Sequence, residues 1–456
     1  MPQPPSVKRA RGHVADRTDR GAPQSLKAAP LPEPAHLLRC GDGTAQLTRL
    51  EEVRLGRRLP VWLLGLANVP LGITGAIALF VAPQVLASRH VPETTIADIT
   101  TLGLSSTIFF VIVAPMLDVR FSRRTYAISM SIAAAALTFI AVLNFSSVIL
   151  LGAWLFLAML CANLNSSAIG GWFGSVLPKE YDAPLGAWFT VANVAGFGIT
   201  SIIGILLIHH APPLVAAVVL GSLNLLPLLI FMWVHPPTES RQRAAETFAR
   251  FGREVVQLAR GREVRRLLLL LALPCASFAL TNTLGGLGGD YHASEKLIAF
   301  IGGVGVTLAG VAGSLSVPIL SRRAPLLKVY LGIGFIGGLS TLSLLVLGHT
   351  PAVFVYAFVA QNVAQSAALS TGNALILSSI GKNNPLASTQ FALLTAAMSA
   401  PITYMQWVDG QAYGAGGLTR MYATDGGLDL LACTVMTLLF VYWARRSRGD
   451  PVAARA

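Results

Sequence analysis

From Leu59 to about Arg445 the chain alternates apolar stretches with short polar loops. A helix needs about 20 predominantly apolar residues to cross the hydrocarbon core of a bilayer, and these stretches have that length. The sequence predicts twelve spans, near residues 59–82, 97–117, 125–144, 147–170, 185–208, 214–234, 266–289, 297–320, 328–347, 353–380, 387–408 and 427–444. Only 12% of the residues are charged and 54% are hydrophobic, which excludes an ordinary soluble protein of this length. We therefore expect an all-α polytopic membrane protein.

The basic residues are distributed unevenly over the two sides of these spans. All but three of the 34 lysines and arginines fall on one side, and the exceptions are Arg89, Lys296 and Arg420. Because Lys and Arg are retained on the cytoplasmic face during insertion, we expect both termini in the cytoplasm and an even number of spans. The formal charge of +13 then reflects topology and attraction to anionic membrane lipids, so no nucleic-acid partner is expected.

The spans fall into two groups of six, joined by a charged linker. We expect a disordered basic cytoplasmic tail over residues 1–58, a six-helix bundle over 59–234, a linker over 235–265, a second bundle over 266–444 and a short cytoplasmic tail over 445–456. In the linker, Phe248, Phe251, Val255 and Leu258 recur at helical spacing. They predict an amphipathic helix on the inner membrane surface, and the alternative is a solvated linker.

The two groups of spans carry a weak internal repeat. Three short proline-containing segments, at Pro70, Pro115 and Pro184, recur at nearly the same separation around Pro274, Pro318 and Pro385. All three occupy equivalent places in their spans. This pattern indicates duplication of a six-helix unit, an architecture in which substrate binds between two halves near the bilayer midplane.

One loop carries a family resemblance. The residues from Ala114 to Arg124, APMLDVRFSRR, resemble the signature loop of the major facilitator superfamily, although the proline and the double arginine depart from its usual spacing. This variant, together with STQFALL at 388–394, is similar to the branch that contains anhydromuropeptide permeases, acetyl-coenzyme A transporters and related siderophore importers. The resemblance covers residues 60–445. It implies the major facilitator fold of twelve helices in two six-helix pseudo-repeats, and a permease that acts as a monomer in a bacterial inner membrane.

The signature loop predicts a gate. Asp118 is expected at the cytoplasmic end of the second span, opposite the start of the eleventh span, where the helix dipole favours an anion by roughly 0.3 to 1 kcal/mol. Our hypothesis is that Asp118 holds the inner gate shut. It would be assisted by Arg120, Arg123 and Arg124. These arginines would form ion pairs either with Asp118 or with the loop carboxylates Glu180 and Asp182. In the alternative interpretation these arginines only fix the topology.

No acidic or basic side chain is expected near the middle of any span. Asp98, Asp290 and Asp409 are expected at the outer ends. An intramembrane carboxylate would be the natural proton carrier. Coupling to protons would therefore use these outer acids or be absent.

Neutral polar side chains are the candidates for solute binding. They are Gln361, Gln365 and Asn373 in the tenth span, with Asn163, Asn193 and Asn282 in the fourth, fifth and seventh. Amides in a lipid environment need partners, so these groups should point inward. The alternative role is structural, because polar residues also join membrane helices by hydrogen bonds.

Signatures of soluble enzymes are missing, since the sequence has no phosphate-binding loop, no His-Glu-x-x-His and no Gly-x-Ser-x-Gly. The four cysteines indicate neither a disulfide framework nor a metal site, and we expect no cofactor. The prediction is a secondary transporter, not an enzyme, that moves a small polar organic solute, peptide-like or sugar-peptide, by alternating access. An exporter of amphipathic drugs or siderophores, a membrane enzyme and a non-transporting sensor on the same fold remain the alternatives.

Overall fold

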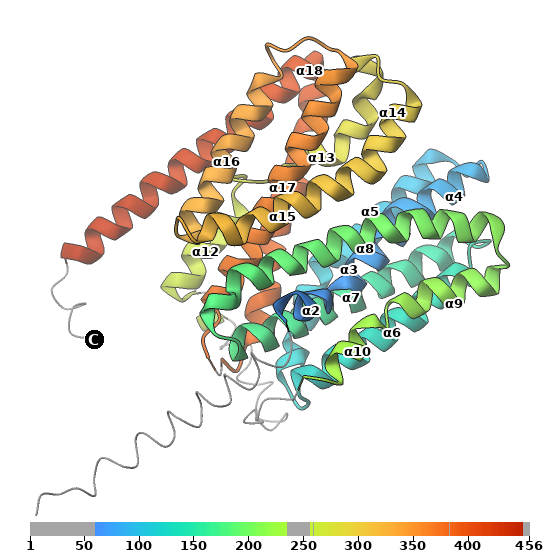
Figure 1. Ribbon diagram of the computed structural model, residues 1–456, viewed down its shortest axis with the longest axis horizontal. Coiled ribbons are helices and arrows are strands. Elements are labelled where there is room, and N and C mark those ends of the chain that lie inside the picture. Colours follow the sequence, from blue (N-terminus) through green and yellow to red (C-terminus); the bar gives the residue numbers. More distant parts are fainter. Residues whose placement is uncertain (1–59, 235–255, 259, 383, 450–456) are drawn as a thin grey trace, which may run out of the picture. The chain divides into compact units, whose positions relative to one another are not determined.

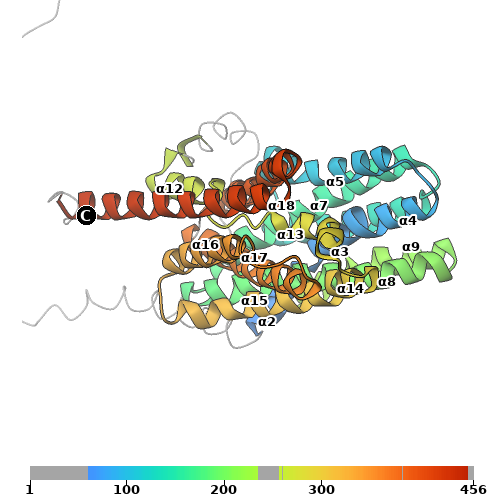
Figure 2. The same cartoon turned by 90° about the horizontal axis from the view of Figure 1, so that it is seen from above.

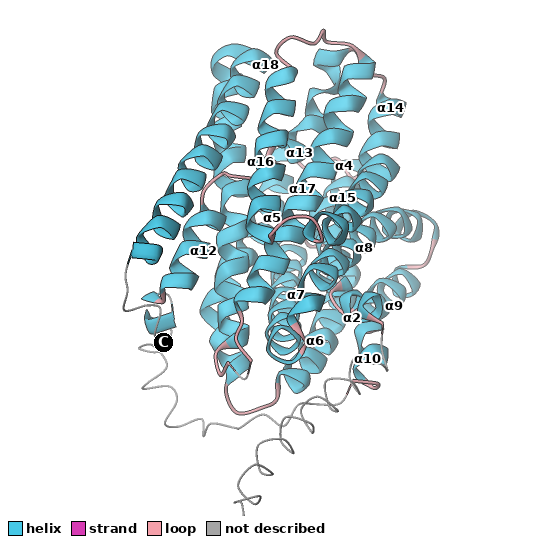
Figure 3. Ribbon diagram, turned by 60° about the vertical axis from the view of Figure 1, so that its left-hand side comes forward, coloured by secondary structure: helices cyan, strands magenta, loops and turns pink. Residues whose placement is uncertain are grey.

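The computed structural model describes residues 60–234, 256–258, 260–382 and 384–449, and every regular element in these ranges is a helix (Figures 1 and 3). The predicted tail over 1–58 lies outside the described residues, as do most of the linker over 235–265 and the last residues of the chain. Of the four apolar positions in the predicted linker helix, only Leu258 is described.

The first half contains the segments of the first six predicted spans. The first span consists of α2 (Val61–Leu66), α3 (Val69–Ala76), the π-helical turn η1 (Ile77–Val81) and α4 (Ala82–Ser88). It is followed by α5 (Glu93–Val113), η2 (Ala114–Asp118), α6 (Arg123–Leu143), α7 (Val148–Val176), η3 (Lys179–Tyr181), α8 (Asp182–His210), α9 (Pro213–Leu223) and α10 (Leu226–Phe231).

The second half begins with a broken segment that comprises α12 (Arg262–Ala272), α13 (Leu280–Thr283) and η4 (Leu284–Tyr291). It continues with α14 (Glu295–Phe300), η5 (Ile301–Gly305), α15 (Val306–Ser321), α16 (Leu326–Ser343), α17 (Pro351–Ser379) and α18 (Ala387–Gly449). Non-helical backbone at Gly416 and Gly417 divides α18 into a first arm, 387–415, and a second arm, 418–449. Gly417 has a φ of 64°, a conformation that side-chain-bearing residues rarely adopt, so glycine suits this break.

Ten helices among the described residues are long and apolar enough to cross a membrane. With the two arms of α18 counted separately and the broken segment 262–291 included, the described residues account for the twelve predicted spans. The predicted loop over 409–426 is wrong, because almost all of it belongs to the two helical arms. Its polar side chains reduced the apparent hydrophobicity, yet several of them are buried inside the protein rather than exposed to lipid.

The break in the seventh span matches one in the first. α2 and α3 are separated at Ala67 and Asn68, just before Pro70, and α12 and α13 are separated by residues 273–279, which contain Pro274. Proline lacks the backbone N–H that a continuous helix requires. The two breaks fall at equivalent places, as the internal repeat predicts.

The two halves are joined mainly at one end, here named the Asp118 end. α8 packs against α15 and α17, and α7 and α5 pack against α18, which brings the blue-to-green half beside the yellow-to-red half (Figures 1 and 2). A single hydrophobic core includes Leu117 and Leu177 of the first half and Ile380 and Phe391 of the second. Towards the opposite end each half has its own core. One contains residues from Ile73 to Leu220, and the other contains residues from Leu280 to Tyr422.

Candidate functional site

Asp118 connects the two halves through the start of α18. Its Oδ1 accepts a hydrogen bond from the backbone N–H of Ser388 at 3.1 Å, and its Oδ2 accepts one from the backbone N–H of Thr389 at 2.8 Å. The hydroxyl of Thr389 also donates to Oδ2, at 2.7 Å. The first N–H groups of a helix have no partner within the helix and carry its positive dipole end, so a carboxylate is well suited to this position.

Arg123 completes the same contact from the first turn of α6. Its Nε donates to Oδ1 of Asp118 at 3.0 Å, in an ion pair whose side chains are 7% and 1% exposed. Its Nη2 donates across the interface to the backbone carbonyls of Asn384 and Pro385 at 2.8 and 3.2 Å. One arginine therefore holds the acid in place and itself binds the chain just before α18. We name Asp118, Arg123 and residues 384–389 the gate cluster.

The other two arginines of the signature loop have different surroundings. Arg120 is exposed, has a φ of 67° and lies over the ring of Phe121. Arg124 is half-buried, and its Nε has no hydrogen-bond partner. Among the described residues neither forms an ion pair with Asp118, Glu180 or Asp182. Their roles in the predicted gate stay a prediction, and their surroundings favour the alternative that they fix topology.

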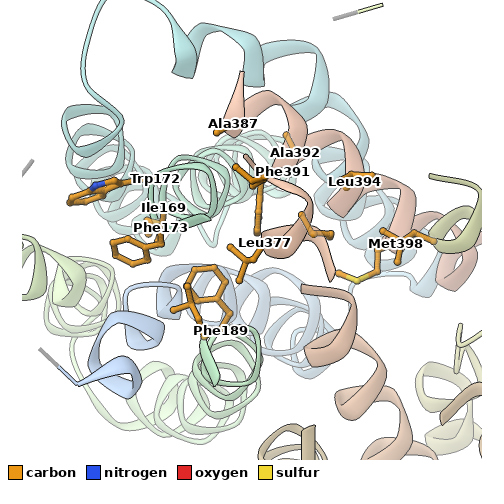
Figure 4. Close-up of a cluster of buried hydrophobic side chains, with 14 of the residues drawn as sticks. Ile169, Trp172, Phe173, Phe189, Leu377, Ala387, Phe391, Ala392, Leu394 and Met398 are labelled. Atoms are coloured by element: carbon orange, nitrogen blue, oxygen red, sulfur yellow. The ribbon is translucent and has the colours of Figure 1, made fainter. Parts of the chain in front are cut away.

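Tight packing surrounds the gate cluster. Phe391 of α18 packs edge-on against Phe189 of α8, with ring centroids 6.3 Å apart, in the apolar cluster drawn in Figure 4. Glycines on α7 and α8 let the helices of the other half approach closely. A Cβ at Gly171 would lie 2.5 Å from the backbone nitrogen of Ser388, and one at Gly186 would lie 2.7 Å from the backbone nitrogen of Ala374. These positions leave no room for a larger residue while the halves are in contact.

Two further hydrogen bonds join the halves. The ammonium of Lys179 donates to the carbonyl of Ser378 at 2.6 Å, and Asn373 Nδ2 donates to Thr190 Oγ1 at 3.2 Å. Asn373, a predicted solute ligand, is thus part of the interface between α17 and α8 in this arrangement.

The two predicted glutamine ligands of α17 contact neighbouring helices, and Gln365 does so at the break in the seventh span. Gln365 Nε2 donates to the carbonyl of Phe278 at 3.2 Å and to Thr281 Oγ1 at 2.7 Å. Gln361 Nε2 donates to Thr341 Oγ1 at 2.6 Å, while its Oε1 is buried without a partner. The amide donors of both glutamines are therefore engaged within the protein.

The three predicted asparagines are not brought together. Asn163 Nδ2 donates to the carbonyl of Met159 in its own helix. Asn193 is half-buried, and its backbone carbonyl lies against Gly72. Asn282 is exposed, with its Nδ2 3.5 Å from Gln406 Oε1. Of the six predicted ligands, Asn282 is the most accessible.

Comparison with known proteins identifies the family. The Major Facilitator Superfamily model matches residues 64–402. The chain belongs to this superfamily. No curated protein sequence matches the chain.

Solved structures of other transporters share the fold at low sequence identity. The human organic anion transporter MFSD10 has a TM-score of 0.64 at 15% identity, over 84% of this chain and 99% of that one. A bacterial homologue of the iron transporter ferroportin in an outward-facing state has a TM-score of 0.60 at 14% identity, over 85% and 100%. The transporter FucP in its outward conformation has a TM-score of 0.60 at 14% identity, over 82% and 97%.

Three acids of this major facilitator protein are buried in the helical arms of α18, near the break between them. Asp409 in the first arm of α18 is 0% exposed, and Asp425 and Asp429 in the second arm are each 1% exposed. Asp98 and Asp290, by contrast, are exposed as expected. The predicted loop over 409–426 hid the burial of Asp409 and Asp425, while Asp429 fell at the start of the predicted span 427–444. The spacing of Asp425 and Asp429, which places both on one helix face, was the available signal.

Proposed function

We propose that this protein is a secondary transporter that moves a small polar organic solute, peptide-like or sugar-peptide, by alternating access coupled to protons. The observation that carries the proposal is the single hydrophobic core shared by both halves at the Asp118 end, beside separate cores towards the other end. Two halves joined at one end can rock about a site between them, which exposes that site to each side in turn.

The closed end is the cytoplasmic one in this proposal. Arg120, Lys179 and Lys382 belong to the basic side of the chain, and they lie in the loops at the Asp118 end. With basic loops retained in the cytoplasm, we infer that both termini lie there as well. The resemblance of the signature loop supports a bacterial inner membrane. The gate cluster is formed, so the arrangement corresponds to an outward-facing state. Two of the similar structures, the ferroportin homologue and FucP, are of proteins in an outward-facing state.

The proposed solute is polar because the accessible hydrogen-bonding groups near the broken seventh helix are neutral amides. Asn282 and Gln406 face each other from α13 and the first arm of α18. Neutral amides can both donate to and accept from a peptide or sugar hydroxyl. The resemblance of the signature loop to the anhydromuropeptide permease branch supports the same class of solute.

The test is uptake by purified protein in proteoliposomes. Solutes that raise the melting temperature in a screen of peptides, amino sugars and sugar-peptides would be radiolabelled. Their uptake would be measured with and without a pH gradient, with protein-free liposomes as the control. Uptake accelerated by the gradient supports the proposal. Binding without any flux in either direction would indicate a sensor, and preferential binding of amphipathic drugs or siderophores would point to the exporter alternative.

A further inference from the structure

Three buried carboxyl groups gather where the two arms of α18 meet. Asp409 and Asp425 lie side by side from opposite arms, and Asp429 lies one turn further along the second arm. Gly426, between the last two, approaches the backbone of Gly338 so closely that an added Cβ would lie 2.9 Å from its carbonyl oxygen. The second arm therefore packs directly on α16, and water and lipid are excluded from this part of the cluster.

These carboxyl groups have few hydrogen-bond donors among the residues that the structure describes. Both oxygens of Asp409, both oxygens of Asp425 and Oδ2 of Asp429 have no partner. Among the described residues, the hydroxyl of Ser277 donates to Oδ1 of Asp429 at 3.2 Å, and the hydroxyl of Thr341 lies beside Asp425. A buried carboxylate without donors or a counter-ion is strongly disfavoured, so it neutralises by binding a proton.

The titratable groups around the cluster that the structure describes supply no positive charge. The titratable groups near Asp429 are Cys275 from the break of the seventh span, Tyr330 from α16, Tyr404 from the first arm of α18 and Cys433 from its own arm. Asp425 lies beside Thr341 of α16. None of the three acids forms an ion pair with a described Lys, Arg or His. Two adjacent carboxylates cannot form a hydrogen bond to each other until one of them is protonated. Two carboxyl groups this close also do not both ionise easily, because their negative charges repel each other.

A second, independent observation also indicates that a hydrogen-bond donor is missing here. Gln361 of α17 is 2% exposed, and its Nε2 donates to Thr341, the neighbour of Asp425. Its Oε1 is an acceptor with no donor. A buried amide oxygen without a donor is uncommon in native proteins. A proton held by the neighbouring acids would turn an acceptor-only cluster into one that also contains donors.

We propose that Asp409, Asp425 and Asp429 form a proton-binding site, and that its occupancy is coupled to the broken seventh helix. The step is simple dissociation: a carboxyl O–H bond breaks, the electron pair stays on the carboxylate and the proton passes to water that reaches the site when the packing around it opens. The described residues contain no group of three His, Cys, Asp or Glu side chains arranged to hold a metal ion, which favours a proton over a metal cation. The coupling part rests on the proposed alternating access.

The connection to the seventh helix runs through two neighbouring residues. Ser277 donates to Asp429, and the carbonyl of the next residue, Phe278, accepts from Gln365. Phe278 has a φ of 47°, and its ring lies against Gly337 of α16. A non-glycine residue in this conformation is strained and persists only when its surroundings hold it. Ionisation of Asp429 would demand more donors than Ser277 supplies, so the segment 273–279 is the element that proton release would move.

The first part of the test needs no substrate. Infrared spectra of the purified protein at a series of pH values, in H2O and D2O, report the C=O stretch of protonated carboxyl groups. The proposal predicts a deuterium-sensitive band at neutral pH that shrinks in Asp425→Asn and in Asp409→Asn. The band should be unchanged in Asp98→Asn, which removes an exposed acid. Asparagine resembles a protonated carboxyl in size and charge, so these variants should fold.

The wild-type spectrum alone can overturn the site. Absence of such a band at neutral pH would show that the acids are ionised. A band abolished by sodium at constant pH would show a sodium site instead. The coupling is read separately, as the pH dependence of thiol labelling at the gate cluster. If the band titrates while the labelling rate of the wild-type protein stays constant with pH, the proposed coupling to the seventh helix is wrong. The gate itself is tested separately, by the labelling rate of the Asp118→Asn variant.

Discussion

Replacing Asp118 by asparagine should open the gate cluster. The carboxylate accepts two hydrogen bonds on each oxygen, from Arg123 and Ser388 on one and from Thr389 on the other. Asparagine keeps one acceptor oxygen but presents an NH2 group to the two donors of Thr389. It also leaves the Arg123 guanidinium buried without its counter-ion. Breaking a buried pair in this way costs about 3 to 5 kcal/mol.

Most of this loss falls on the closed arrangement, because the bonds to Ser388 and Thr389 exist, and the start of α18 covers the Asp118–Arg123 pair, only while the halves meet. At 1.4 kcal/mol per factor of ten, the closed state would lose about a hundred-fold to several thousand-fold in relative population. The variant should remain folded, since each half retains its own core.

The assay is thiol labelling of Ser388→Cys in a protein whose native cysteines are replaced. The Ser388 side chain is 0% exposed and its hydroxyl has no hydrogen-bond partner, so it is a suitable reporter. Labelling of detergent-purified protein should be at least ten-fold faster with Asp118→Asn. The matched control is Arg120→Gln, which removes an exposed charge from the same loop and should leave the rate unchanged. An unchanged rate in a folded Asp118→Asn protein would refute the gate.

Three further outcomes are expected. In intact cells, cysteines at Ser25, Thr247 and Ala453 should resist an impermeant thiol reagent while one at Gly414 reacts; labelling at Thr247 would overturn the twelve-span topology. Gly171→Val should speed labelling of Ser388→Cys as Asp118→Asn does, because its side chain would meet the Ser388 backbone, whereas Gly381→Val, with open space around it, should not. Gln365→Leu leaves the Phe278 carbonyl without its donor and should lower the free energy of unfolding by about 1 to 3 kcal/mol. Asn282→Ala, in contrast, should weaken solute binding and leave the melting temperature unchanged. The opposite pattern would make Gln365 the ligand.

The sequence predicted the helical fold and the position of Asp118 opposite the start of α18, because hydrophobic length and helix polarity are local properties. It did not predict the acidic cluster. A hydropathy average counts Asp425 as a polar residue that favours a loop in water, whereas the residue is buried between α16 and the other arm of α18. The glutamines of α17 show a second limit of local patterns. Their polar face was recognised, but the use of their donors by Thr341 and Phe278 depends on how distant helices pack.

The central claim is that the two ends of the bundle open and close in opposition. Pulsed electron paramagnetic resonance can measure it with two spin-label pairs, each across the two halves. Glu180 with Arg322 reports on the Asp118 end, and His209 with His349 reports on the other; all four side chains are exposed. Asp118→Asn is predicted to lengthen the first distance and shorten the second. Alternating access by these halves would be contradicted if both distances change in the same direction, or if neither distance changes in the folded variant.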